Sequence, residues 1–279
     1  MRVLLTGATG FVGRQILRKL IEKNVSVIPI VRYHKGSNIV GLPNIERVIF
    51  TNDLFRETED WWWRCCQNID IVIHAAWYAE PGSYLQSSQN IECLIGSLNL
   101  AKGAASAGVK KIVGIGTCFE YDFTGGFCSV STAMKPLTSY AATKVALFVT
   151  LTEWLANKGI DFSWCRLFYL YGEGENERRL APYLRRQLEK GEFADLSTGN
   201  QVRDFMDVTE VGNLITNVAL SKQFGAINIC SGVPITVKKF AEKIADEYGR
   251  RDLLRFGARP DNLVDPPCIV GIPNYAPSI

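Results

Sequence analysis

Short apolar runs alternate with longer segments of helical periodicity up to residue 168 of the chain. Apolar runs of this length are typical of strands buried within a parallel sheet. The expected strands are residues 2–6, 25–31, 44–50, 69–76, 111–116 and 161–168, and the expected helices are residues 14–23, 57–66, 89–107 and 140–157. Because strand and helix alternate throughout, the pattern predicts an α/β fold with a doubly wound parallel sheet.

The pattern changes after Tyr171 and Gly172. Residues 173–179 are charged and are expected to form a loop. The further expected elements are helices at 180–190, 209–220 and 237–248, short strands within 195–207, and a strand at 227–230. The pattern after residue 172 predicts a smaller lobe over the carboxyl edge of the sheet, which is where open α/β sheets bind ligands.

Composition narrows the class of protein. The chain has 279 residues, 47% of them hydrophobic and 21% charged, with a net charge of +3, so we expect neither a nucleic-acid nor a membrane partner. The sequence contains no run of about 18 apolar residues and no N-terminal cleavage signal, which favours a cytoplasmic protein. Eight cysteines without a CxxC pair, and only two histidines, predict free thiols and no metal site.

A glycine-rich segment separates the first expected strand from the first expected helix. It reads Gly7-Ala8-Thr9-Gly10-Phe11-Val12-Gly13. A strand, a glycine turn and a helix N-terminus together bind anions, because backbone N–H groups and the helix dipole face the ligand. The spacing is GxxGxxG, which differs from the GxGxxG dinucleotide fingerprint. The segment predicts a site for the pyrophosphate of a dinucleotide, with a plain glycine turn as the alternative.

The end of the second expected strand bears on cofactor choice. An acidic residue at this place usually binds the ribose hydroxyls of NAD, but the chain has Val31 and Arg32, with His34 and Lys35 beyond. An arginine here can pair with a 2′-phosphate, so NADP(H) is favoured and NAD(H) stays possible. The alternative is a solvated basic loop.

Two later segments could also contact the cofactor. Asp53-Leu54 follows the third expected strand, where Asp53 could bind the adenine amine or cap the helix at 57–66. His74-Ala75-Ala76 ends the fourth, and the small side chains of Ala75 and Ala76 would let a cofactor lie against the backbone. We interpret His74 as structural rather than catalytic.

Tyr140 and Lys144 are four residues apart, with Thr143 between them, and therefore lie on one face of a helix. The pKa of a free tyrosine is about 10, and a neighbouring ammonium group would lower it. A phenol tuned in this way could exchange a proton with a sugar or alcohol oxygen. The spacing alone is unspecific, since an exposed Tyr–Lys pair also arises by chance.

Several motifs occur in one order along the chain. They are the glycine-rich segment at 7–13, His74-Ala75-Ala76, Thr117, Tyr140 with Lys144, residues 166–172 (RLFYLYG) and Arg203-Asp204-Phe205. The series, over roughly residues 1–265, resembles the extended short-chain dehydrogenases/reductases, the NAD(P)-dependent epimerase/dehydratase family that acts on nucleotide sugars.

The resemblance implies a Rossmann domain at residues 1–168, to which segments near 200–231 return, and a nucleotide-sugar lobe at 169–279. It implies that Thr117, Tyr140 and Lys144 are catalytic and that Lys144 also binds the nicotinamide ribose. The remaining implied contacts are Phe168 with the nicotinamide, Tyr169 with the sugar diphosphate, and Arg203 and Arg259 with that diphosphate. For the two arginines the alternative is a role in surface solubility.

The resemblance also implies a homodimer with a four-helix interface built from the helices at 89–107 and 140–157. The second of these helices carries apolar residues beyond one stripe, namely Leu147, Phe148, Leu151, Trp154 and Leu155.

Besides the missing acidic residue at the end of the second expected strand, two further departures from the family limit the inference. The 4,6-dehydratases carry Asp and Glu directly after the catalytic Thr, whereas this chain has Cys118 and Phe119 there. Glu120 comes one position later, and an extended chain would aim it at the other face. The chain also ends at residues 273–279 without the expected last helix, so the lobe could be incomplete or differently closed.

Three functions follow from these observations. The favoured one is NADPH-dependent reduction of the C4 keto group of a nucleotide-activated 4-keto-6-deoxy sugar. The alternatives are a 4-epimerase that retains NAD, and a non-catalytic NAD(P)-binding regulator. The first two share every residue named above.

Overall fold

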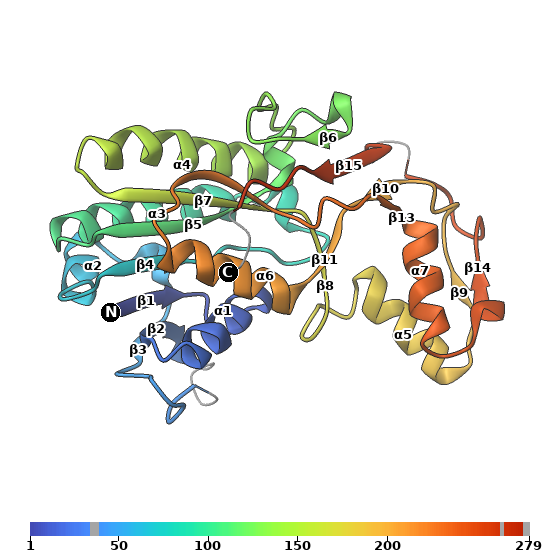
Figure 1. Ribbon diagram of the computed structural model, residues 1–279, viewed down its shortest axis with the longest axis horizontal. Helices are drawn as coiled ribbons and strands as arrows, with labels where there is room; N and C mark the ends of the chain where they lie inside the picture. Colours follow the sequence, from blue (N-terminus) through green and yellow to red (C-terminus); the bar gives the residue numbers. More distant parts are fainter. Residues whose placement is uncertain (34–38, 263–264, 276–279) are drawn as a thin grey trace.

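A computed structural model describes residues 1–33, 39–262 and 265–275 (Figure 1). His34, Lys35 and the chain end at 276–279 lie outside the described residues. A seven-stranded parallel sheet occupies the centre, in the order β12-β7-β5-β4-β1-β2-β3. Its strands are β1 (Arg2–Thr6), β2 (Ser26–Arg32), β3 (Ile49–Thr51), β4 (Ile71–His74), β5 (Lys111–Thr117), β7 (Asp161–Leu167) and β12 (Gly225–Ile229). The predicted doubly wound α/β class is confirmed.

Helices cover both faces of this sheet (Figure 1). They are α1 (Phe11–Glu22) and α6 (Val208–Leu220) on one face, and α2 (Glu59–Cys65), α3 (Gln89–Ser106) and α4 (Ser139–Ala156) on the other. Successive strand residues point to opposite faces. Val3 and Leu5 therefore join the core under α1 and α6, whereas Leu4 joins the core under α2, α3 and α4.

The expected strand at 44–50 is wrong in its first half, because β3 begins only at Ile49. Asn44 has a positive φ of 61°, which a strand cannot accommodate. Around it the Val27 N–H donates to the Asn44 carbonyl at 2.9 Å, and the Glu46 N–H donates to the Val27 carbonyl at 3.1 Å. The chain thus makes a single bridge to β2 before it joins the sheet.

A smaller lobe lies at one end of the sheet (Figure 1). It contains α5 (Leu180–Lys190) and α7 (Val237–Asp246), which share a separate apolar core. Short strands complete it in three small sheets. The first sheet has the strand order β13 (Ile235–Thr236), β10 (Val202–Arg203), β15 (Cys268–Gly271) and β6 (Phe127–Cys128). The second sheet pairs β11 (Phe205–Asp207) with β8 (Tyr169–Tyr171), and the third pairs β14 (Leu254–Arg255) with β9 (Ala194–Asp195). The sequence did not predict β15, whose partners β10 and β6 are remote in the chain.

The apolar residues expected to reach a dimer surface from α4 lie mostly inside the protein. Leu147, Leu151 and Leu155 are at most 4% exposed and pack in the core under α3 and α4. These three leucines form the buried stripe, whereas Phe148 and Trp154 are partly exposed, so the apolar residues of α4 extend beyond one stripe as predicted. None of the described helices is both long and apolar enough to cross a membrane.

Candidate active site

The glycine-rich segment forms a tight turn between β1 and α1. Gly7 has a φ of 74°, and a Cβ there would lie 2.7 Å from the Ala76 nitrogen. A Cβ on Gly13 would lie 2.0 Å from the Gly7 carbonyl oxygen, so the first turn of α1 packs directly on the glycine loop.

Helix α1 begins at Phe11 and Val12, after Gly10 as its N-cap. No side chain caps this end and no acidic residue occupies the first turn. Its N–H groups and positive dipole end therefore remain for an anion, which fits the pyrophosphate of a dinucleotide.

The residues predicted to bind the adenosine half of the cofactor, Arg32 and Asp53, lie at or just after the carboxyl ends of β2 and β3, the edge of the sheet at which the glycine turn also lies. Arg32 ends β2 and is exposed. Asp53 accepts a hydrogen bond from the Phe55 N–H at 3.0 Å and caps the short 3-10 helix Leu54–Arg56. The alternative that Asp53 caps the next helix is wrong, because Thr58 caps α2 through the Trp61 N–H.

His74 is buried at the end of β4 between two hydroxyl groups. Its Nδ1 lies 2.8 Å from Thr6 Oγ1, and its Nε2 lies 2.8 Å from Ser97 Oγ. Burial lowers its pKa to about 3, with a further lowering by the Lys144 charge. A neutral ring with both nitrogens engaged supports the structural interpretation of this histidine.

Thr117, Tyr140 and Lys144 converge where β5 meets the start of α4. Lys144 is 3% exposed, and its Nζ donates to the Ile115 carbonyl at 2.7 Å. The same Nζ lies 3.6 Å from the centroid of the Trp77 ring. Burial lowers the pKa of Lys144 to about 7, and the Glu120 charge opposes this effect.

The pKa of Tyr140 is raised, so the prediction that the Lys144 ammonium lowers it is wrong. Burial of the phenol is the main cause, and the charges of Tyr84 and Glu120 add to it, while a hydrogen bond with Thr117 acts the other way. The ammonium group is directed to the Ile115 carbonyl and the Trp77 ring instead. A phenol of this kind is protonated near neutral pH and can act as a proton donor but not as a base, and its raised pKa makes it a weaker acid than a free tyrosine.

The sequence did not predict that two aromatic side chains, Tyr84 and Trp77, pack around Tyr140 and Lys144. The Tyr84 ring lies edge-on to Tyr140, with centroids 4.9 Å apart, and the Trp77 ring lies 6.5 Å from it. Trp77 Nε1 donates to the buried Asn90 side chain at 2.9 Å, and the Asn90 amide donates to the Tyr84 carbonyl at 2.7 Å. The available signal was the position of Trp77, directly after the two alanines that follow β4.

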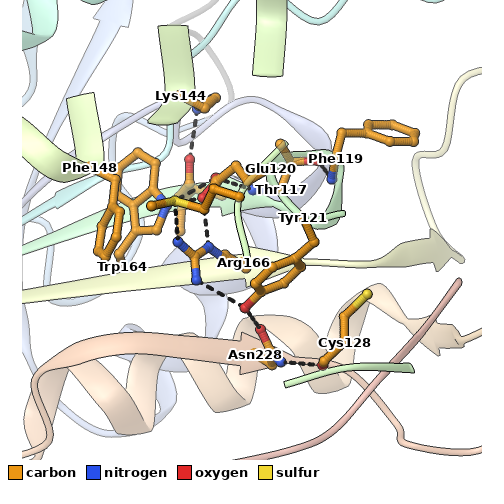
Figure 2. Close-up of polar contacts among 12 residues, drawn as sticks. Thr117, Phe119, Glu120, Tyr121, Cys128, Lys144, Phe148, Trp164, Arg166 and Asn228 are labelled. Carbon is orange, nitrogen blue, oxygen red and sulfur yellow. Dashed lines mark hydrogen bonds and ion pairs between the residues drawn. The ribbon is translucent and has the colours of Figure 1, made fainter. Parts of the chain in front are cut away.

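Thr117 is held by a short turn at the end of β5 (Figure 2). Its Oγ1 accepts from the Phe119 N–H at 3.3 Å, and its own N–H donates to Glu120 Oε1 at 2.9 Å. Residues Cys118–Glu120 form a 3-10 helix, so the assumption of an extended chain here is wrong. Glu120 is fully buried and bonded to Arg166, which leaves no carboxylate here for acid–base work on a ligand.

The remaining predicted contacts are with the nicotinamide, for Phe168, and with the sugar diphosphate, for Tyr169, Arg203 and Arg259. Phe168 is buried among apolar residues next to Gly271, and Tyr169 stacks near Arg203, whose guanidinium lies 5.2 Å from the ring centroid. Arg203 is 2% exposed and donates to Asp265 at 2.6 Å. Arg259 instead donates to the Tyr183 hydroxyl at 3.0 Å. Within the described ranges, no group of three or more His, Cys, Asp or Glu is placed to hold a metal ion.

Known proteins resemble this chain over nearly its whole length. The chain is 24% identical over 273 residues to a dTDP-6-deoxy-L-talose 4-dehydrogenase (NAD(+)) of Aggregatibacter actinomycetemcomitans, covering 97% of this chain and 99% of that protein. It is 25% identical over 272 residues to the CDP-abequose synthase of Salmonella typhimurium, covering 92% and 84%.

Solved structures share the fold. A UDP-N-acetylglucosamine 4-epimerase from Methanobrevibacter ruminantium, in complex with UDP-N-acetylmuramic acid, superposes with a TM-score of 0.84 at 23% identity, covering 97% of this chain and 89% of that one. Residues 3–230 match the NAD dependent epimerase/dehydratase family. With this match over most of its length and the glycine turn, Tyr140 and Lys144 in place, the chain belongs to the NAD dependent epimerase/dehydratase family of enzymes.

Proposed function

We propose that the protein reduces the C4 keto group of a nucleotide-activated 4-keto-6-deoxy sugar with NADPH. The observation that carries this proposal is the convergence of Thr117, Tyr140 and Lys144 beside a glycine turn that fits a dinucleotide. The arrangement suits chemistry at a single carbonyl or alcohol carbon, because it offers one proton donor and one further hydrogen-bond donor for a single oxygen.

Tyr140 acts as the general acid in this proposal. The phenol is protonated at neutral pH, so that it can give its proton to the C4 oxygen as the carbonyl becomes an alcohol. The bound nicotinamide cofactor supplies the hydride. Thr117 would donate a second hydrogen bond to the same oxygen, in exchange for the one that its hydroxyl makes with Tyr140.

Several residues of this chain would hold the cofactor. Gly7, Gly10, Phe11, Val12 and Gly13 would bind the pyrophosphate, and the Ala75–Ala76 backbone would lie along the dinucleotide. Asp53 and Leu54 would contact the adenine, Lys144 the nicotinamide ribose, and Phe168 the nicotinamide ring. Arg32 carries the preference for NADP(H), because it is exposed at the end of β2 where the 2′-phosphate would lie.

The smaller lobe would bind the sugar nucleotide. Tyr169 and Arg203 lie together on β8 and β10, and Arg259 lies against the Tyr183 ring. The diphosphate would take the place of the Asp265 carboxylate on the Arg203 guanidinium, whose planar fork suits either anion. The relatives named for dTDP and CDP sugars support this substrate class.

The names of the relatives bear on the direction of the chemistry. A 4-dehydrogenase oxidises at the position where the proposed reductase reduces, and a relative from Kitasatospora kifunensis, 25% identical over 271 residues, is named for NAD(P)(+). The alternative is a 4-epimerase that retains NAD. It is favoured by the structural likeness to the UDP-N-acetylglucosamine 4-epimerase.

A homodimer through α3 and α4 completes the proposal. Ile91 and Ile95 of α3 are each 49% exposed and lie one helical turn apart, and Val149 of α4 is 46% exposed. Two copies of this helix pair would bury these residues in a four-helix interface.

The test is NADPH oxidation by the purified protein with a panel of nucleotide-activated 4-keto-6-deoxy sugars. Consumption of NADPH with formation of one C4 alcohol supports the reductase. Copurified NAD, with interconversion of C4 epimers and no net oxidation, would support the epimerase instead. Absence of turnover with every sugar would leave the non-catalytic regulator.

A further inference from the structure

Glu120 and Arg166 form an ion pair in the interior, directly behind the turn that carries Thr117 (Figure 2). Arg166 Nε donates to Glu120 Oε2 at 2.6 Å, and the two side chains are 2% and 0% exposed. Burying two charges costs more than their attraction recovers unless further hydrogen bonds satisfy both groups. A pair of this kind is therefore weak evidence for a purely stabilising role.

The Glu120 carboxylate accepts from three donors on two neighbouring strands, Thr117 at the end of β5 and Trp164 and Arg166 on β7. It accepts from the Thr117 N–H at 2.9 Å, from Trp164 Nε1 at 3.0 and 3.1 Å, and from Arg166 Nε. Gly116 makes room for this arrangement, because a Cβ there would lie 2.3 Å from Trp164 Nε1 and 2.6 Å from Glu120 Oε1. The residue before Thr117 thus lets the carboxylate reach under the strand.

The hydrogen bonds continue from Arg166 to the smaller lobe. Arg166 Nη1 donates to the Tyr121 hydroxyl at 2.9 Å, and that hydroxyl donates to Asn228 Oδ1 at 2.6 Å. The Asn228 amide donates to the Cys128 carbonyl on β6 at 2.9 Å and to the Ile272 carbonyl, just after β15, at 3.1 Å. Strands β6 and β15 belong to the same small sheet as β10, which carries Arg203.

We propose that Glu120 is a positioning residue, which uses the buried Arg166 to fix Thr117 relative to Tyr140 and to the sheet of the smaller lobe. This inference rests on the proposed function, in which Thr117 and Tyr140 act on the same oxygen. Glu120 itself touches no reacting atom. It acts by holding the Thr117 backbone, and a misplacement of a reacting group by about 1 Å can cost 10²-fold in rate.

The charge of Glu120 has a second effect that gives an independent readout. It raises the pKa of both Lys144 and Tyr140. The other titratable groups facing Lys144 are His74 and Cys93, which stay neutral near pH 7 because burial lowers the pKa of the histidine and raises that of the thiol. Without the Glu120 charge, both Lys144 and Tyr140 would lose their protons at lower pH.

Two charge-matched double variants separate positioning from stability. Glu120→Gln with Arg166→Met keeps an acceptor for the Thr117 N–H, whereas Glu120→Met with Arg166→Met removes it. Both remove the ion pair as a unit, which often leaves stability unchanged. We expect kcat to be roughly 10-fold or more lower in the second than in the first, with unchanged KM for the cofactor.

Lys111→Met is the matched control for loss of a buried charge. Lys111 begins β5, at the opposite end from Thr117, and its Nζ donates to the carbonyls of Val218, Ser221 and Gln223. This variant should lower the melting temperature while kcat stays within about threefold of the wild type. In both double variants, the alkaline limb of the kcat profile should move to lower pH, and Lys111→Met should leave it in place.

Equal kcat in the two double variants would overturn the proposal. Amide hydrogen exchange of Thr117, followed by NMR, tests it without any substrate. The exchange should be slow in the wild type and fast in Glu120→Met/Arg166→Met. Fast exchange in the wild type would also overturn the proposal, whether or not the variants fold. If the wild type turns over no sugar while Thr117 exchange behaves as expected, the proposed function fails and the positioning of Thr117 stands.

Discussion

Replacing Tyr140 with Phe removes one hydroxyl group and keeps the ring. The ring contacts with Tyr84 and Trp77, at 4.9 and 6.5 Å between centroids, do not depend on that hydroxyl. The loss to folding is therefore limited to the hydrogen bond with Thr117, on the order of 1 kcal/mol. We expect the variant to fold and to bind cofactor like the wild type.

The loss to catalysis should be much larger. A positioned general acid contributes roughly 10²–10⁴ in rate. At about 1.36 kcal/mol for each factor of ten, this corresponds to about 2.7–5.4 kcal/mol of the barrier. The stability and rate effects therefore differ enough to be told apart in one variant.

The assay is NADPH oxidation under substrate saturation, with cofactor affinity measured separately by quenching of tryptophan fluorescence. Tyr84→Phe is the matched control, because it deletes the same atom from the neighbouring ring and should reduce kcat less than threefold. Lys144→Ala supplies a contrast, since it should weaken cofactor binding as well as turnover. Near-normal turnover of Tyr140→Phe with a keto sugar would refute the assigned mechanism and require another proton donor.

Four further outcomes can be measured. Arg32→Asp should reverse the cofactor preference toward NAD, since a charge-assisted hydrogen bond contributes about 1.5–3 kcal/mol; a wild type that binds NAD more tightly than NADP would contradict this. Thr117→Val should lower kcat less than Tyr140→Phe does, because it removes a hydrogen bond and no proton; a larger loss in kcat would make Thr117 the principal acid. Ile95→Lys should shift the protein from dimer to monomer in light scattering at micromolar concentration, and a wild type that is already monomeric would exclude the interface. His74 is neutral in the fold with a pKa of about 3 against an ordinary 6.5, so the unfolded chain binds the additional proton and stability should fall as pH drops from 6.5 toward 3. His74→Gln should show a smaller fall in melting temperature over that range than the wild type, and equal slopes would assign the pH dependence to other groups.

Local patterns were sufficient to predict the large sheet. Helices separate most of its strands in the chain, and a parallel arrangement follows from that alternation. The helix at 180–190 was predicted to the residue, because its apolar positions repeat regularly and Gly191 ends it in a left-handed conformation. By contrast, β15 has four residues and exists only through partners remote in the chain, so no local signal marks it.

The pKa values of the catalytic pair could not be predicted from spacing. The spacing of four positions from Tyr140 to Lys144 places both on one face of α4, and from this the sequence suggested that the cation tunes the phenol. The long lysine side chain, however, ends at the Ile115 carbonyl and the Trp77 ring. Burial then dominates both groups and moves their pKa values in opposite directions, because it disfavours the charged form of each.

The role of Glu120 depends on strand register, which is why sequence alone assigned it no partner. Strands β5 and β7 pair in parallel with Gly116 beside Arg166 and Gly114 beside Trp164. Both glycines are needed, since a Cβ on either would lie within 2.5 Å of the Trp164 ring. With the indole lying across these two positions, its Nε1 and the adjacent Arg166 meet the same carboxylate. Gly114 and Gly116 therefore contribute to the active site from behind the strand, because they leave room for Trp164, which together with Arg166 holds Glu120 in place.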